Sequence, residues 1–134
     1  MKIPLDPSTT LMDIQRQFQL MFPLLSIRFS DKEHQFGEAI LHGHWHDESL
    51  PFLSITKTRY RDYIEIEKWY KTGDVEQLLQ KFFGVHPQVF RKQNDSWIQT
   101  AGTDEFTLEE QNEIAQKNIQ DEMGSFWPKT DALL

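Results

Sequence analysis

The sequence predicts a single α+β domain over residues 1–134: a two-layer sandwich with helices on one face of a mainly antiparallel four-stranded sheet, plus a C-terminal helix. Two observations predict this class. Capped segments with apolar residues at helical spacing alternate with segments in which every second residue is apolar. Strands that have one apolar face suit a sheet that helices cover on one side.

The first helix is predicted to begin at Leu11, because Thr10 is a candidate N-cap and Asp13 can complete a capping box. Its apolar stripe comprises Leu11, Ile14, Phe18 and Phe22. Pro23 cannot continue the helical hydrogen-bond ladder and ends it. Residues 25–30 then alternate apolar and polar side chains, which predicts a half-buried strand.

The middle of the chain is predicted to form short elements: a turn at 31–34, a short strand at 36–41 and a loop at 42–48. The apolar residues between Leu50 and Ile55 require burial, but their pattern fits no single type of element. Alternation returns over residues 60–69, where Ile64 and Ile66 share one face, and it predicts another strand.

A second helix is predicted over residues 72–83, with a cap signal at Thr72-Gly73-Asp74 and a helix-ending glycine at Gly84. A hairpin follows in three parts: a strand at 85–92, a polar turn at 93–96 and a returning strand that begins at Trp97. Thr107 and Glu110 form a capping box that opens a third helix, and Gly124 is expected to stop it.

The two halves of this pattern correspond at an offset of 61 residues. Asp13, Phe18, Phe22 and Phe29 align in this way with Asp74, Leu79, Phe83 and Phe90. Each half is a capped helix, a breaker and a strand, so the chain is compatible with an α-β-β duplication. Helical periodicity alone produces the same match by chance, and both readings stay open.

Composition limits the classes of function. The chain has no cysteine, which excludes disulfides and thiolate catalysis and fits a reducing compartment. We expect a soluble, cytoplasmic protein, because no secretory or membrane-spanning apolar run is present. The net charge is −7; residues 1–94 balance, and the acidic excess lies in residues 95–134. Such a field disfavours nucleic acid and anionic membranes as partners.

Alternating histidines could bind a metal. His42, His44 and His46 point to one side if the segment is extended, and His34 lies upstream. Imidazole with nearby carboxylates suits zinc or another divalent metal. Three residues of one straight strand are too far apart to share an ion, since i and i+4 lie about 13 Å apart. The alternative is a solvated, histidine-rich loop.

Two basic and aromatic clusters are candidate binding sites. Arg59 and Arg61 share a face of an extended segment that also contains tyrosines, a composition typical of single-strand nucleic-acid platforms or of an edge strand protected by charge. Arg91 lies across the predicted hairpin from Trp97. This second pair can bind an anionic or protein ligand, or it can be a cross-strand cation–π contact.

No catalytic motif is present: the sequence has no glycine-rich phosphate loop, nucleophile elbow or HExxH. We therefore favour a non-enzymatic protein-interaction or self-association module, which binds an unknown protein partner or forms a homo-oligomer. Aromatic residues expected at the periphery support it: Trp45, Trp69, Tyr70, Phe126 and Trp127. Metal binding through the histidines, small-ligand binding and nucleic-acid binding are the alternatives.

A set of short motifs is spread along the chain: Asp13-Ile14-Gln15, Phe22-Pro23, Val89-Phe90-Arg91-Lys92, Trp97, Thr103-Asp104, Phe106-Thr107-Leu108 and Gln111-Asn112. In these motifs the chain resembles a family of short, uncharacterised bacterial proteins of unknown function. It covers most of the chain and weakens across residues 31–58. It implies a self-contained domain and supplies no activity, ligand or site.

Overall fold

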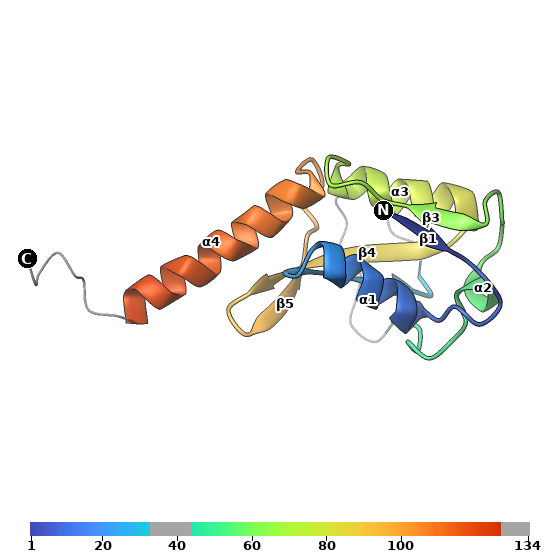
Figure 1. Ribbon diagram of the computed structural model, residues 1–134, viewed down its shortest axis with the longest axis horizontal. Coiled ribbons are helices and arrows are strands. Elements are labelled where there is room, and N and C mark those ends of the chain that lie inside the picture. The colour runs from blue at the N-terminus through green and yellow to red at the C-terminus, as the bar shows by residue number, and fades with distance from the viewer. Residues whose placement is uncertain (33–43, 127–134) are drawn as a thin grey trace, which may run out of the picture.

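A computed structural model describes residues 1–32 and 44–126. The protein is α+β (Figure 1). Its elements, in chain order, are β1 (Lys2–Pro4), α1 (Leu11–Met21), β2 (Leu25–Ser30), α2 (Phe52–Ile55), β3 (Tyr63–Glu65), α3 (Thr72–Phe83), β4 (His86–Gln93), β5 (Ser96–Gln99) and α4 (Leu108–Phe126). No helix in these two ranges is long and apolar enough to cross a membrane.

Within residues 1–32 and 44–126 the strands form two antiparallel sheets, so the predicted single sheet of four strands is not confirmed. One has the order β2-β4-β5, and the other is a ribbon of β1 and β3. The predicted strand at 36–41 lies outside the described residues. The expected strand at 60–69 is only β3, and it pairs with β1, which no sequence pattern had predicted. At its other edge β2 forms an antiparallel bridge between Ser30 and Trp45.

One hydrophobic core joins both sheets to the helices. The ribbon contributes Ile3 and Ile64, and β2 contributes Leu25, Ile27 and Phe29. The helices contribute Leu11, Ile14 and Phe18 from α1, Phe52 from α2, Val75, Leu79 and Phe83 from α3, and Leu108 from α4. The apolar stripe predicted for α1 therefore does face the core, and Val75, Leu79 and Phe83 form the corresponding stripe of α3.

The helix ends test the predicted caps. The capping boxes of α1 (Thr10 with Asp13) and α4 (Thr107 with Glu110) are both present. The cap signal at Thr72-Gly73-Asp74 is wrong, because the N-cap of α3 is Lys71, which makes no side-chain cap bond. Gly124 does not stop α4, which continues to Phe126; a glycine lowers helix propensity by only about 1 kcal/mol.

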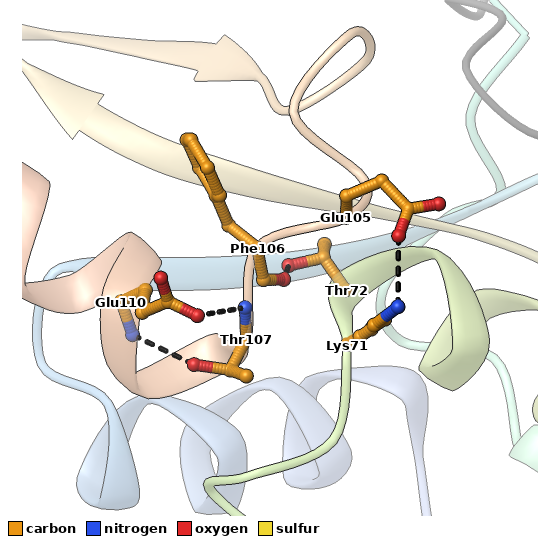
Figure 2. Close-up of polar contacts among 6 residues, drawn as sticks. All are labelled: Lys71, Thr72, Glu105, Phe106, Thr107 and Glu110. Carbon is orange, nitrogen blue, oxygen red and sulfur yellow. Dashed lines mark hydrogen bonds and ion pairs between the residues drawn. The ribbon is translucent and has the colours of Figure 1, made fainter.

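A polar junction connects the beginnings of α3 and α4 (Figure 2). The Thr72 hydroxyl, which is fully buried, donates to the Phe106 carbonyl at 2.7 Å. The Lys71 ammonium lies 2.8 Å from a carboxylate oxygen of Glu105. The Leu108 N–H also donates to the Tyr70 carbonyl at 3.0 Å. These bonds fix the start of α3 and the residues before it, although α4 itself extends away from the body (Figure 1).

The other end of α3 is fixed by residues 57–60. Gly84 ends the helix with a φ of 64°, as the sequence predicted. The Phe83 carbonyl accepts from the Lys57 N–H at 2.9 Å, and the Phe82 carbonyl accepts from the Tyr60 N–H at 3.1 Å. A Cβ atom at Gly84 would lie only 2.8 Å from the Lys57 Cβ, so the missing side chain permits this close approach.

We expect Gly84→Ala to reduce the free energy of unfolding by about 2–4 kcal/mol, because the left-handed backbone and the contact with Lys57 both penalise a side chain. Gly102→Ala is the comparison. Gly102 also has a positive φ, of 89°, but a Cβ atom at that position would meet nothing within 4 Å. Urea unfolding should show the larger loss for Gly84→Ala; equal losses would contradict the packing argument.

Candidate functional site

A groove separates β3 from α3 and is the main candidate site. Its volume is about 200 Å³, and it is open to solvent. We call it the β3–α3 groove; its walls include Tyr63, Ile64 and Glu65 of β3, Val75, Leu78 and Phe82 of α3, and Arg61 and Tyr70 at its ends. Apolar walls with a few polar groups are typical of ligand-binding clefts.

The hydrogen bonds of the ribbon determine which main-chain groups face this groove. The Leu5 N–H donates to the Asp62 carbonyl at 2.8 Å, and the Ile66 N–H donates to the Met1 carbonyl at 3.0 Å. These two pairs are four residues apart on each strand. In an antiparallel pair such bonded positions alternate with positions whose N–H and C=O point away from the partner strand.

Tyr63 and Glu65 occupy the outward positions of β3. Their N–H and C=O groups therefore point away from β1, and within residues 1–32 and 44–126 they have no hydrogen-bond partner. Pro4 faces Tyr63 in the register and has no N–H, so the opposite edge of the ribbon cannot offer a full set of donors. The edge of β3 retains its donors and acceptors.

Arg61 lies at one end of the groove. Its guanidinium carbon is 4.0 Å from the centre of the Phe82 ring and 5.6 Å from that of Tyr63. In the described part of the chain it forms no hydrogen bond or ion pair. Arg59, predicted together with it, instead lies 3.1 Å from the Asp62 carboxylate and is about half exposed. The structure thus separates the two arginines, and nucleic-acid binding stays an untested prediction.

Exposed aromatic side chains flank the groove. Tyr60 is 73% exposed beside the Phe82 end, and Trp69 is 62% exposed beside Tyr70 at the other end. The Trp69 and Tyr70 rings meet edge to face at 6.2 Å. Trp127, also expected at the periphery, lies outside the described residues. Large exposed aromatic groups beside an apolar groove are common in protein interfaces.

A second, more open groove of about 660 Å³ lies on the three-stranded sheet, with Arg28, Trp45, Phe90 and Trp97 in its walls. The Arg28 guanidinium lies over the Trp45 ring at 5.1 Å. The cation above the Trp97 ring is Lys92 at 5.4 Å. Arg91, predicted to join Trp97, is instead buried and donates to the Gln111 side chain at 2.6 Å. The register explains this, because Lys92 faces Trp97 and Arg91 faces Ile98.

The predicted histidine cluster is only partly described. His34 and His42 lie outside the described residues. The backbone of His44 to His46 pairs with residues 29–31, and the His44 Nδ1 lies 3.6 Å from the Asp31 carboxylate. Residues 1–32 and 44–126 contain no group of three or more candidate metal ligands. Zinc binding therefore stays a prediction.

Two buried carboxylates, which line neither groove, were not predicted from the sequence. Glu76, 5% exposed, accepts a hydrogen bond from the Val89 N–H at 2.8 Å, and Asp104 is 4% exposed. Burial, together with the nearby negative charge of Asp104, raises the pKa of Glu76 to about 8, while the Val89 N–H opposes the shift. Position 76 falls on the stripe of Val75, Leu79 and Phe83, which was the available signal.

No protein-family model, curated protein or solved structure matches the chain.

Glu76 should make the stability of the protein pH-dependent. The pKa of Glu76 is about 8 in the folded state against an ordinary value of 4.5, so the folded state keeps a proton that the unfolded state releases. The free energy of unfolding should fall as the pH rises from about 4.5 to about 8, by an amount on the order of 5 kcal/mol, and then level off.

Glu76→Gln should remove that decrease, whereas Glu113→Gln, at an exposed position of α4, should retain it. Urea unfolding of the three proteins at pH 5 and pH 8 measures the effect. A Glu76→Gln variant with the wild-type pH dependence would rule out Glu76 as the cause.

Proposed function

We propose that the protein is a non-enzymatic interaction module that binds an extended segment of a partner protein in the β3–α3 groove. The observation that carries the proposal is the edge of β3, which presents the unpaired main-chain groups of Tyr63 and Glu65 to a groove that is lined along most of its length by apolar residues of α3 and β3. A segment added there as a third strand would satisfy these groups. This is the β-augmentation mode of peptide recognition.

The contrast between the two edges of the ribbon supports this reading. Proteins protect exposed strand edges with proline, charge or covering elements. The outer edge of β1 carries Lys2 and Pro4, which serve that purpose. The edge of β3 carries the charge of Glu65 but no proline, and α3 borders it across a groove instead of covering it. An edge that keeps its hydrogen-bonding groups beside apolar walls is suited to a partner strand.

The charge distribution and composition support related parts of the proposal. The acidic excess of residues 95–134 opposes nucleic acid as the partner. The lack of cysteine fits a reducing compartment, and we propose a cytoplasmic location. We also propose that the chain belongs to the family of short bacterial proteins that it resembles. A second copy of this chain remains a candidate partner, and the experiment below distinguishes it.

We also propose that the chain arose by duplication of a β-α-β unit. The starts of β1 and β3, of α1 and α3, and of β2 and β4 are each 61 residues apart. Equivalent strands pair with each other in both sheets, with Ile3 opposite Ile64 in the ribbon. Under this correspondence the binding edge is present only in the second half, because Pro4, the counterpart of Glu65 in the first half, has no N–H to donate.

A proline at position 65 should close the binding edge. Glu65→Pro removes an outward N–H, and the counterpart position in β1 already holds Pro4, so the fold should tolerate it. We expect peptide affinity to fall about tenfold, because at least one main-chain hydrogen bond is lost and the edge is blocked. Glu65→Gln, which keeps the N–H, should bind nearly as well as the wild type.

Binding is measured by fluorescence anisotropy with binders from a synthetic pool of extended peptides, and by protection of the Tyr63 and Glu65 amides from hydrogen exchange. Light scattering tests whether the partner is a second copy of this chain. If the protein is a dimer and Glu65→Pro dissociates it, the second copy is the ligand. Unchanged affinity and unchanged assembly in Glu65→Pro would count against the groove.

A further inference from the structure

We infer that the β3–α3 groove binds the C-terminal end of its partner, with the partner's free α-carboxylate on Arg61. This inference rests on the proposed function and specifies its ligand. The strand would run antiparallel to β3, and its terminal apolar side chain would enter the groove.

Charge determines the direction of the added strand. Arg61 precedes β3 and Glu65 ends it, and the two side chains share one face of the strand. Four residues of extended chain separate them by about 13 Å. An antiparallel segment places its C-terminal end beside Arg61 and its earlier residues beside Glu65. A parallel segment would place its C-terminal end beside the Glu65 carboxylate, which repels it.

The surroundings of Arg61 prepare it for a carboxylate. The Phe82 ring lies 4.0 Å below the guanidinium carbon, so the planar group is supported on one face while its N–H groups remain available. The described part of the chain provides no acceptor for them. The Phe82 and Phe83 carbonyls accept from the Tyr60 and Lys57 N–H groups, and within the described residues neither accepts from the guanidinium. A carboxylate can accept two parallel N–H bonds from it.

The size of the groove limits the ligand to one apolar side chain beside the carboxylate. Its volume is about 200 Å³. A cavity of about 150 Å³ lined by apolar side chains binds benzene. The groove therefore suits one side chain such as that of leucine, isoleucine or phenylalanine, with Leu78 and Phe82 on one wall.

The test uses two matched pools of synthetic seven-residue peptides that end in an apolar residue, one with a free carboxylate and one with a carboxamide. Each peptide is titrated into the full chain by fluorescence anisotropy, and binding at the groove is located by shifts of the Tyr63 and Glu65 amide resonances. We expect the free acids to bind about tenfold more tightly than their amides, as loss of a charged hydrogen-bonded pair implies.

Two arginine variants separate recognition from folding. Arg61→Gln should lower the affinity for the acids to that for the amides and leave the amides unchanged. Arg59→Gln is the matched control, because Arg59 pairs with Asp62 and does not line the groove. It should leave both affinities unchanged. Urea unfolding checks that Arg61→Gln remains folded.

Three results would overturn the inference. In the first, acids and amides bind with equal affinity while the Tyr63 and Glu65 resonances still shift. This result rules out recognition of the carboxylate but leaves the proposed interaction module intact. If Arg61→Gln lowers the affinity for the acids and for the amides equally, Arg61 maintains the shape of the groove and does not bind the carboxylate. If neither pool shifts the resonances of Tyr63 and Glu65, both the inference and the proposed function fail.

Discussion

The antiparallel pairing of β1 with β3 is the constraint on which the candidate site depends. Ile3 and Ile64 face each other in that pair, and both are fully buried in the common core. A slip by one residue would turn these side chains towards solvent, so the hydrophobic effect fixes the register. Once the register is fixed, the outward positions of β3 are fixed too. The unpaired N–H and C=O groups of Tyr63 and Glu65 are a direct consequence of burying two isoleucines.

The groove exists because its two walls are held by different partners. The ribbon holds β3, whereas the sheet of β2, β4 and β5 holds α3 through the core contacts of Val75 and Leu79. The two ends of α3 are fixed separately, by the junction with α4 at Thr72 and by residues 57–60 at Gly84. The space between the walls is therefore set by bonds that a ligand does not need to break. A pre-formed site of this kind avoids much of the ordering cost of binding.

The sequence predicted what depends on neighbouring residues. Caps at Thr10 and Thr107, the apolar stripes of α1 and α3, and the ending glycine at Gly84 are local signals, and each is present. Sheet membership is not local. β1 has three residues and contains Pro4, so its sequence has no pattern that predicts a strand. Its partner lies about sixty residues away in the chain. The predicted sheet of four strands is not confirmed, because in the described part of the chain β3 pairs with β1, a partner that could not be read from β3 itself.

The candidate site also combines local features that the sequence predicts with nonlocal features that it does not. The residue type at position 61 was identified from the basic and aromatic pattern around it, but the feature that distinguishes Arg61 from Arg59 is a ring on another element. Phe82 comes from α3, and only the fold brings it under the guanidinium. The buried Glu76 was missed for a related reason: its carboxylate accepts from the Val89 N–H of β4, a partner that the sequence of α3 does not reveal.

The acidic character of the chain does not oppose an anionic ligand at Arg61. The net charge of −7 repels anions at long range, but its excess lies in residues 95–134, and charges more than about 8 Å apart are largely screened at physiological salt. At the groove the binding of an anion depends on the nearby charges, with Arg61 at one end of the groove and Glu65 at the other. Because an arginine with aromatic support binds carboxylates in a defined orientation, the site can select by direction and by end group while the remaining surface discourages nonspecific anions.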